Sequence, residues 1–307
     1  MIPGVLVCGN IVYDILVRPV DEIRYETSTW VEDISTFLGG NGSNTSYAIA
    51  KLGVTARLIG VVGQDPFGDA VLAILHEAGV DTRRVSRIPA STATTVGLVA
   101  TDGKRAFLHR PGCSRESFAN PIEFTPDLTA GCATFHLANI FAMPLLRRSG
   151  PECVRRARAA GLRTSSDTGW DARGEWMAVL GPCLPHLDIL FTNEDEARQL
   201  TGAADHLAAA AALRAAGPKI VVIKRGPLGC SVFTPDSSFD SPALKVTAID
   251  TTGAGDTFAG GFLAALHRGL SLEEAARVAN AVGAMNVTRL GAVAGLGSWQ
   301  ETISRLP

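Results

Sequence analysis

The most informative stretch of this 307-residue chain is Asp-Thr-Thr-Gly-Ala-Gly-Asp-Thr-Phe-Ala-Gly-Gly-Phe, residues 250–262. Leu244–Ile249 before it is strand-like, and Phe258–Leu266 is an apolar helical pattern. The glycines therefore form a turn at the start of a helix. Glycine lets a backbone approach a ligand closely, and free N–H groups with the helix dipole favour an anion there. The pattern predicts an anion-binding turn at Gly253, Ala254 and Gly255.

Asp256 follows this turn and falls in the first turn of the expected helix. A carboxylate beside a phosphate site can accept the proton of a hydroxyl that attacks the phosphate. An aspartate near a helix start is more commonly a cap or a partner of the helix dipole. The length of the surrounding string and the motifs elsewhere in the chain favour the general base.

Short apolar runs alternate with helical patterns along the rest of the chain. Such alternation indicates an α/β fold with a mostly parallel central sheet flanked by helices. The expected strands are Val5–Cys8, Arg57–Val62, Ala133–Leu137, Leu162–Ser166, Asp188–Thr192 and Ile220–Lys224. The expected helices are Ser43–Leu52, Phe67–Ala78, Pro151–Ala160, Glu194–Leu200 and His206–Ala216, and a glycine follows most of them.

Two segments, about 12–37 and 92–110, break the alternation. The second contains a hairpin pattern around Asp102-Gly103. We expect both segments to form a small β-sheet lid on a single domain covering residues 1–307. An exposed small sheet has edges to cover, so the lid is also a candidate homodimer interface.

Composition excludes several classes of function. Hydrophobic residues are 46% and charged residues 19% of the chain, as in globular proteins. A net charge of −2 gives no general attraction for nucleic acid or an anionic membrane, and no apolar run is long enough to span a bilayer. The six scattered cysteines suggest neither zinc nor a disulfide framework, so we expect a cytoplasmic protein.

The chain resembles the ribokinase-like (pfkB-type) carbohydrate kinases. Five segments carry the resemblance in family order: Gly39–Asn44 continuing to Gly53, Gly63–Gly68, Thr192–Glu196, Lys224–Gly229, and residues 250–262. The resemblance implies a ribokinase-like fold and ATP-dependent phosphorylation of a hydroxyl on a small sugar or sugar derivative. It implies ATP and Mg²⁺, with Asp256 as base and the turn 253–255 as anion hole.

The resemblance also implies a substrate pocket. Its members would be Asp14, Gly40, Asn41 and Asn44, and Asn139 follows a strand that could bring it to the same place. Without the resemblance, the glycine pair reads equally well as a tight turn, and Asp14 as a turn carboxylate.

A second group of residues would serve the nucleotide. The resemblance places Asn193 and Glu196 near Mg²⁺, through waters, although the same pair fits an N-cap with its N3 carboxylate. It places Lys224, Gly226 and Gly229 along the phosphates and Asn280 beside the adenine; packing is the plainer interpretation of the small residues around Asn280.

Asp250 and Thr252 resemble the start of a monovalent-cation loop found in part of the family. The expected second half of that loop, residues 288–297, is rich in glycine and poor in polar side chains. Dependence on K⁺ therefore stays open.

Residues 166–171 depart from the family's Asp-x-Asn-x-Arg pattern, with Trp170 and Asp171 at the changed positions. No motif selects one sugar. The alternatives are a nucleoside kinase of the same fold and a non-catalytic sugar sensor on the same scaffold. The short polar side chains of the pocket favour a sugar, because a nucleoside also requires aromatic walls, for which Tyr13, Phe107 and Trp170 are the candidates.

Overall fold

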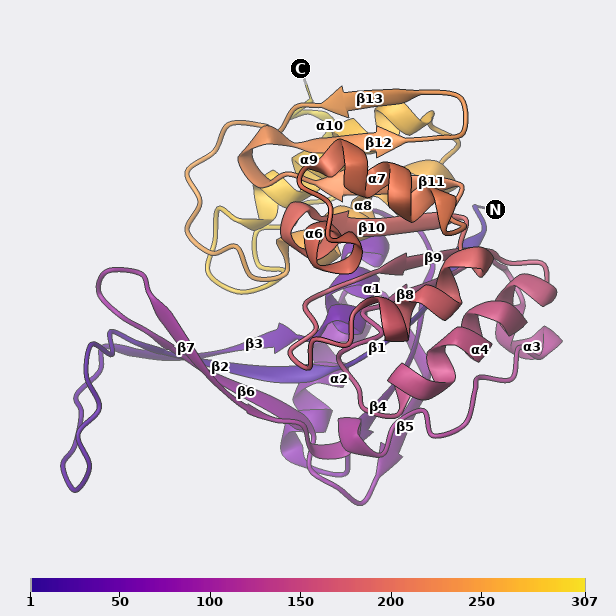
Figure 1. Cartoon of the computed structure of the whole chain (residues 1–307). Coiled ribbons are helices and arrows are strands. Elements are labelled where there is room, and N and C mark those ends of the chain that lie inside the picture. The colour runs from indigo at the N-terminus through magenta and orange to yellow at the C-terminus, as the bar shows by residue number, and fades with distance from the viewer. Residues whose placement is uncertain (1, 307) are drawn as a thin grey trace.

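A computed structural model describes residues 2–306, which form a large sheet between helices and a smaller sheet that projects from it (Figure 1). The large sheet has nine strands in the order β13-β12-β11-β10-β9-β8-β1-β4-β5. Every pairing from β11 to β5 is parallel, and β12 and β13 extend the sheet antiparallel. The strands are β1 Gly4–Gly9, β4 Ala56–Gly63, β5 Asp81–Ile88, β8 Cys132–Ala138, β9 Arg163–Asp167, β10 Ile189–Asn193, β11 Ile220–Lys224, β12 Cys230–Phe233 and β13 Ser238–Ser241.

Helices cover both faces of this sheet, so its central strands are apolar on both sides. In β1, Val5 and Val7 join one core while Leu6 and Cys8 join the other. The first core includes α1 (Asn41–Lys51), α2 (Pro66–Glu77), α8 (Ala254–His267) and α9 (Leu272–Asn286). The second includes α4 (Leu146–Ala159), α5 (Met177–Leu180), α6 (Glu194–Thr201) and α7 (His206–Ala215). The α/β class and the mostly parallel sheet expected from the sequence are confirmed.

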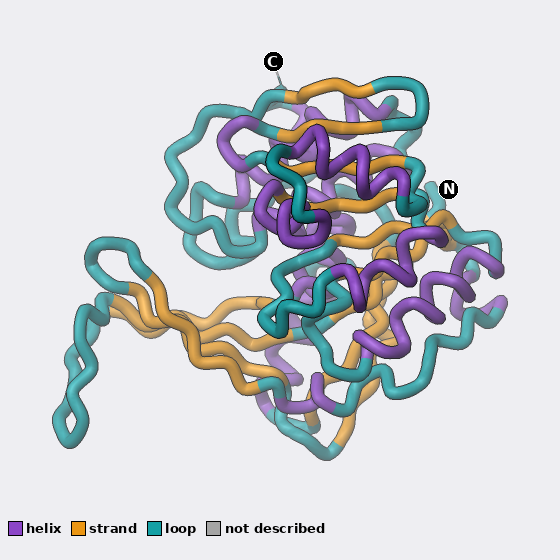
Figure 2. The backbone as a smooth tube through the Cα atoms, viewed as in Figure 1, coloured by secondary structure: helices purple, strands orange, loops and turns teal. Residues whose placement is uncertain are grey.

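The smaller sheet contains four strands in the order β3-β2-β6-β7. They are β2 Val12–Arg18, β3 Asp33–Gly39, β6 Ala93–Val99 and β7 Arg105–Arg110, and only β3 extends beyond the expected lid segments, by two residues. Figure 2 shows these strands leaving the body together as an arm that ends in loops. We call this sheet the lid.

Two expectations about elements were wrong in detail, and strand β5 was not expected. Residues 244–249 form an irregular, largely exposed segment rather than a strand, because their apolar side chains line a cavity instead of packing into the sheet. Helix α4 begins at Leu146, so Pro151 lies inside it rather than at its start. Strand β5 escaped notice because its sequence, Asp-Thr-Arg-Arg-Val-Ser-Arg-Ile, is charged and half exposed at the sheet edge.

Shorter helical pieces complete the chain: η1 Gly112–Arg115, α3 Pro126–Thr129, η2 Gly181–His186, η3 Gly226–Leu228 and α10 Trp299–Ile303. Within residues 2–306, no helix has the length and apolar character needed to cross a membrane.

Candidate active site

Four neighbouring parallel strands deliver polar side chains to one edge of the large sheet. Asn139 directly follows β8, while Asp167, Asn193 and Lys224 are the last residues of β9, β10 and β11. All four line a cavity of about 670 Å³ at the carboxyl ends of these strands. Ligands bind at this edge in open α/β sheets. The N-terminus of α8 forms the opposite wall, with Gly253, Ala254, Gly255 and Asp256 in the lining.

Two asparagines of α1 hold the Asp256 carboxylate. Asn41 Nδ2 donates to Oδ1 at 2.7 Å, and Asn44 Nδ2 donates to Oδ2 at 2.9 Å. Asn139 Nδ2 donates in turn to Asn41 Oδ1 at 3.1 Å, which fixes which end of the Asn41 amide faces the aspartate. Three of the residues predicted to bind substrate therefore form one hydrogen-bonded chain with the predicted base.

Burial makes the Asp256 carboxylate more basic than an exposed aspartate. Its side chain is 7% exposed. Burial raises the pKa of Asp256, and the hydrogen bonds from Asn41 and Asn44 and the charge of Lys224 only partly oppose this. A buried carboxylate with a raised pKa is a better proton acceptor than an ordinary surface aspartate.

The turn before α8 has the backbone that an anion site needs. Gly253 has a left-handed φ of 71°, and a Cβ there would lie 2.5 Å from the Ala292 carbonyl oxygen, so a larger residue is strained and crowded. Among residues 2–306, no side chain caps α8. The Ala254 N–H donates to the Thr251 carbonyl at 3.2 Å. The N–H groups of Gly255 and Asp256, in the first turn, have no intrahelical acceptor and remain for an anion. The sequence had suggested Ala254 as a third donor.

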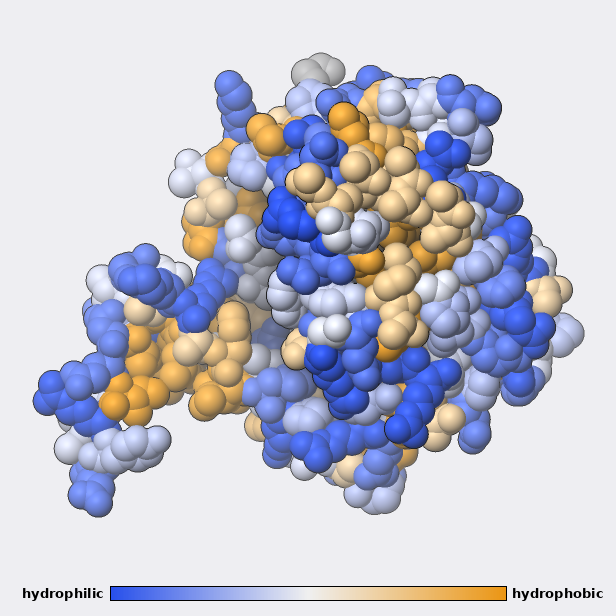
Figure 3. Space-filling model, viewed as in Figure 1, coloured by the Kyte–Doolittle hydropathy of each residue, from blue (hydrophilic) through white to orange (hydrophobic). Residues whose placement is uncertain are grey.

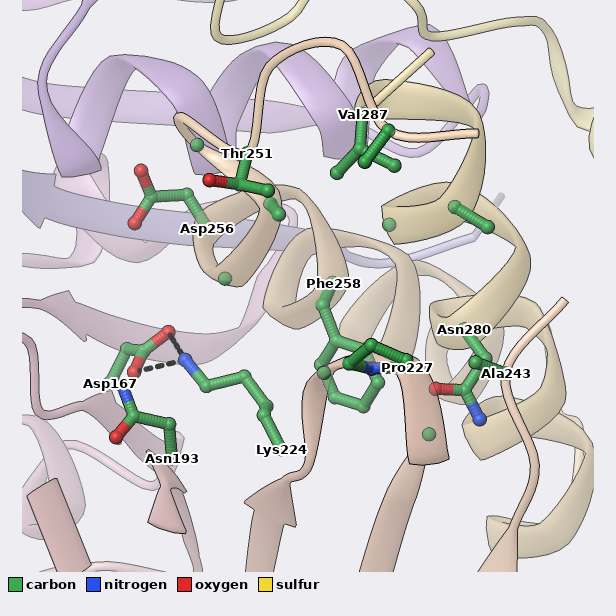
Figure 4. Close-up of a pocket in the computed structure, with 18 of the residues that line it drawn as sticks. Asp167, Asn193, Lys224, Pro227, Ala243, Thr251, Asp256, Phe258, Asn280 and Val287 are labelled. Carbon is green, nitrogen blue, oxygen red and sulfur yellow. Dashed lines mark hydrogen bonds and ion pairs between the residues drawn. The ribbon is translucent and has the colours of Figure 1, made fainter. Parts of the chain in front are cut away.

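An ammonium group faces this turn. A Cβ added to Gly255 would lie 3.0 Å from Lys224 Nζ, so glycine leaves room for the lysine. Lys224 Nζ donates to both carboxylate oxygens of Asp167 at 2.7 Å, and Figure 4 shows the two side chains pointing at each other. The sequence predicted Lys224 but gave no role to Asp167. The position of Asp167 at a strand end was the signal that could have found it.

The charges around Lys224 are unbalanced. Burial works against the ammonium ion, yet Asp167, Glu196 and Asp256 raise the pKa of Lys224 above its usual value. Burial raises the pKa of Asp167 to about 7, although Lys224 opposes it. Three carboxylates thus share one ammonium, and the cluster has a deficit of positive charge that a cation would relieve.

Asn193 and Glu196 form a capping box at the start of α6. Glu196 N donates to Asn193 Oδ1 at 2.8 Å, and Asn193 N donates to Glu196 Oε2 at 3.0 Å. Thr168 Oγ1 also donates to Oε2. Glu196 lines the cavity, and no described residue hydrogen-bonds its other oxygen, Oε1. Glu196 can therefore cap α6 through Oε2 and still bind a water of Mg²⁺ through Oε1, since Mg²⁺ keeps several of its waters.

The far end of the cavity is an apolar slot. Its walls include Pro227, Ala243, Val246, Phe258, Gly283 and Val287. Asn280 Nδ2 donates to the carbonyl oxygens of Ser241 and Pro242, at 2.9 and 3.2 Å, and so anchors the segment that forms one wall. Gly226 and Gly229 have φ values of 53° and 93° and shape the loop after β11. The slot has the flat, apolar character that suits a nucleobase.

Asp14 lies on the lid rather than in the large cavity. It packs against Gly39, where an added Cβ would be 2.1 Å from Asp14 Oδ2. It lines a small separate cavity with Phe37, Thr95, Phe107 and the segment that contains Asp250 and Thr252. Burial raises the pKa of Asp14 to about 6. Gly40, with a φ of 93°, connects this region to Asn41.

Arg105 of the lid contacts Asp250 and Thr252. Its Nη1 lies 2.5 Å from Asp250 Oδ1 and 3.0 Å from Thr252 Oγ1. Asn286 Nδ2 donates to the Thr252 carbonyl at 3.0 Å. The sequence had suggested a monovalent-cation loop here. A bare cation does not fit this arrangement at the Asp250 carboxylate, because the Arg105 guanidinium lies on Oδ1 and the Gly291 N–H donates to Oδ2.

The unusual segment 166–171 has two different roles. Asp171 is buried in a bidentate ion pair with Arg147 of α4, with distances of 2.9 and 3.1 Å, and so supports the fold rather than a ligand. Trp170 lines the large cavity, remains 58% exposed, and makes an edge contact with Trp176.

Comparison with known proteins agrees with this arrangement. The family model for "pfkB family carbohydrate kinase" matches residues 4–298. Fructokinase-1 of Oryza sativa subsp. japonica is 31% identical over 281 residues, covering 86% of this chain and 87% of the relative. An ATP-dependent ribose-1-phosphate kinase of Halopiger xanaduensis is 32% identical over 291 residues, covering 94% of this chain and 93% of the relative.

A solved structure of Ribokinase II from E. coli, in complex with ATP and Mg²⁺, superposes with a TM-score of 0.87 at 25% identity. The match covers 98% of each chain. The ribokinase-like fold and the family resemblance seen in the sequence are thereby confirmed, and the chain belongs to the pfkB family of carbohydrate kinases.

Proposed function

We propose that this protein transfers the γ-phosphoryl group of ATP to a hydroxyl group of a small sugar or sugar derivative. The observation that carries the proposal is the position of Asp256. Its carboxylate lies one residue beyond an uncapped Gly-Ala-Gly turn, is buried, and is held by two asparagines at the edge of a cavity of about 670 Å³.

Asp256 is the proposed general base. In the free protein its Oδ1 accepts a hydrogen bond from Asn41. A sugar hydroxyl that replaces this contact would donate to Oδ1 and transfer its proton there as its oxygen attacks phosphorus. Asn44 would keep Oδ2 in place through its 2.9 Å hydrogen bond. Asn41 and Asn139, already linked, would turn their amides toward neighbouring hydroxyls of the sugar.

The anion turn and Lys224 are the proposed stabilisers of the transferring group. The N–H groups of Gly255 and Asp256 point along the start of α8, and Lys224 Nζ lies against Gly255. Such preorganised donors stabilise negative charge that develops during transfer. Mg²⁺ bound with ATP would neutralise phosphate charge, and Glu196, near the charge-deficient cluster around Lys224, would hold it through water.

The apolar slot around Asn280 is the proposed adenine site. It lies in the same cavity as the anion turn. ATP bound along this cavity would extend from the slot, past the loop of Gly226 and Gly229, to the turn. The relative with bound ATP and Mg²⁺ supports this assignment by its similarity over 98% of the chain.

A sugar is favoured over a nucleoside as phosphoryl acceptor. Of the three aromatic candidates for base-stacking walls, only Trp170 lines the large cavity. Tyr13 is stacked on Phe67 with ring centroids 4.5 Å apart, and Phe107 lines the separate small cavity beside Asp14. The groups nearest Asp256 are asparagine amides, which suit hydroxyls.

The deciding experiment measures ADP release with a panel of acceptors. The panel contains pentoses, hexoses, sugar acids and sugar phosphates, with adenosine, inosine and cytidine as competitors. We expect at least one sugar-type acceptor to give the highest kcat/KM. A nucleoside with a higher kcat/KM than every sugar tested would instead identify a nucleoside kinase. The absence of acceptor-dependent ADP release would favour a sugar sensor.

A homodimer formed through the lid is the proposed assembly. The outer face of the lid carries apolar side chains from four adjacent strands: Ile15, Val17, Ile34, Val96, Leu98 and Leu108. Ile34 is 63% and Leu108 62% exposed, and Figure 3 shows apolar side chains gathered on this arm. A second copy would cover this face and leave Asp14 and its small cavity, on the opposite face, uncovered. We place the protein in the cytoplasm, where ATP and reduced thiols are available.

Replacing Leu108 by Asp is expected to convert the dimer to a monomer, because it places a charge in the middle of the proposed apolar contact. Sedimentation velocity of wild type and variant measures the change. Leu207→Asp is the matched control, since Leu207 is also exposed (58%) but lies on α7, away from the lid. A wild-type protein that sediments as a monomer at ~10 µM, or a Leu108→Asp variant that remains dimeric, contradicts the proposed interface.

A further inference from the structure

Arg105, the first residue of β7, connects the lid to the backbone just before the anion turn. Its Nη1 donates to Asp250 Oδ1 and Thr252 Oγ1, and its Nη2 lies 3.4 Å from the Ile249 carbonyl oxygen. One side chain therefore holds this segment at three points, Ile249, Asp250 and Thr252. That side chain belongs to a different sheet, about 145 residues away in sequence.

Asp250 depends on this guanidinium for its charge balance. Its side chain is fully buried, and Arg105 is the cation paired with it. It also accepts hydrogen bonds from two backbone N–H groups: Gly291 N donates to Oδ2 at 2.9 Å and Thr252 N donates to Oδ1 at 2.8 Å. Burial works against ionisation, but the hydrogen bonds from Arg105, Gly291 and Thr252 outweigh it and hold the pKa of Asp250 below its ordinary value.

The contacted segment leads directly into the anion turn. Thr252 precedes Gly253, whose left-handed backbone starts α8. On the other side, Asn286 of α9 fixes the Thr252 carbonyl at 3.0 Å. Asp250 and Thr252 are therefore held from the lid and from α9 at once. A shift of this segment would move the N–H groups of Gly255 and Asp256 relative to the phosphate, and misplacement by about 1 Å can lower a rate by ~10²-fold.

We propose that Arg105 is a positioning residue that couples the lid to the anion turn and supplies, as part of the chain, the positive charge that Asp250 requires. The inference rests on the proposed kinase function. Two consequences follow. Phosphoryl transfer is efficient only when the lid is placed so that Arg105 reaches Asp250, and the wild-type enzyme needs no alkali metal ion at this carboxylate.

The first experiment uses the wild-type protein. Turnover with the best acceptor from the panel is measured in KCl, NaCl and choline chloride at equal ionic strength. We expect rates that agree within about two-fold, because the Arg105 guanidinium occupies Asp250 Oδ1. Activation by K⁺ of ~10-fold or more over both other salts overturns the proposal, since it would show that a metal ion and not Arg105 completes the loop.

The second experiment removes the guanidinium. Arg105→Ala is expected to lower kcat by ~10- to 100-fold, and added guanidinium chloride at millimolar concentration is expected to restore part of the loss. Lys104→Ala is the matched control. Lys104 is the adjacent cation, but it is 86% exposed and pairs with Asp102 in the turn of the same hairpin. Its removal should change neither kcat nor the response to guanidinium.

A readout without turnover separates this inference from the proposed function. Hydrogen exchange of peptides covering residues 249–258 should be faster in Arg105→Ala than in wild type, and unchanged in Lys104→Ala. Equal exchange, or a kcat of Arg105→Ala within two-fold of wild type, overturns the coupling. Should Arg105→Ala fail to fold, Arg105→Lys takes its place with the same readouts. This variant keeps the positive charge but replaces the guanidinium group with a single nitrogen. A wild type that phosphorylates no acceptor refutes the proposed function, whereas the exchange result stands independently.

Discussion

Replacing Asp256 by Asn is expected to lower kcat by ~10²–10⁴-fold while the fold and ATP binding are retained. The amide has nearly the same shape as the carboxylate but cannot take a proton from the acceptor hydroxyl. Asn41 and Asn44 both donate to the aspartate, so one of their two hydrogen bonds would be lost in the variant. Steady-state ADP release measures kcat, and calorimetric titration with ATP together with thermal unfolding provides the control. A kcat near that of wild type would falsify the assignment of the base.

The pH profile gives the same assignment a second, independent check. Burial raises the pKa of Asp256, and the base works only when deprotonated. Activity should therefore fall as the pH drops through this raised pKa, at a higher pH than an exposed aspartate would give. The residual activity of the Asp256→Asn variant should lack this acidic limb. An acidic limb that is identical in the variant would assign the titration to another group, such as Asp14, whose pKa is raised to about 6.

Replacing Lys224 by Met is the second change expected to have a large effect. The ammonium group lies against Gly255 and within 2.7 Å of both Asp167 oxygens, so its loss removes a positive charge from the proposed phosphate site. We expect kcat/KM for ATP to fall by ~10²–10³-fold. Wild-type kcat/KM for ATP in Lys224→Met would show that the lysine serves only the fold.

The stability of Lys224→Met separates the contribution of Lys224 to the fold from its proposed role at the phosphates. Breaking a buried ion pair from one side costs about 3–5 kcal/mol, because the partner charge is left uncompensated. Burial already raises the pKa of Asp167 to about 7, and loss of Lys224 raises it further. Below about pH 7 the Asp167 carboxyl is largely protonated in both proteins, so the deficit of Lys224→Met should be smallest there and should grow as the pH rises above about 7, where wild type loses this proton and the variant keeps it.

A double variant completes this comparison. Adding Asp167→Asn to Lys224→Met removes the buried charge and should recover most of the lost free energy of unfolding, measured by urea denaturation at pH 8. Activity should not return, since the ammonium group is still missing. Recovery of both stability and activity in the double variant would contradict a role for Lys224 at the phosphates.

The sequence was most informative where function depends on local backbone. The turn at 253–255 is formed by three consecutive residues, Gly-Ala-Gly, and the capping box is formed by Asn193 and Glu196, which are three residues apart. In both cases the chemistry and the local structure require the same short pattern. The strand ends could be predicted as well, because buried parallel strands are short apolar runs, and this placed Asn139 and Lys224 correctly at one edge of the sheet.

Contacts between distant segments could not be predicted in this way. The pair of Asp167 and Lys224 joins two strands separated by β10, and the pair of Arg105 and Asp250 joins the lid to the body. Each partner alone is an ordinary charged residue, and only the folded topology shows that it is buried beside an opposite charge. The irregular path of residues 244–249 was mistaken for a strand for a related reason, since apolar side chains on a cavity wall resemble those in a sheet.

Transfer of a labelled phosphoryl group tests the central claim most directly. Wild-type protein is incubated with ATP labelled with ³²P at the γ-position and the best acceptor from the panel, and the products are separated and identified by mass spectrometry. The account predicts that the label appears in a phosphate ester of the sugar-type acceptor, in amounts equal to the ADP formed, and that Asp256→Asn loses this transfer. Label released only as inorganic phosphate, or carried mainly by a nucleoside in competition, would contradict it.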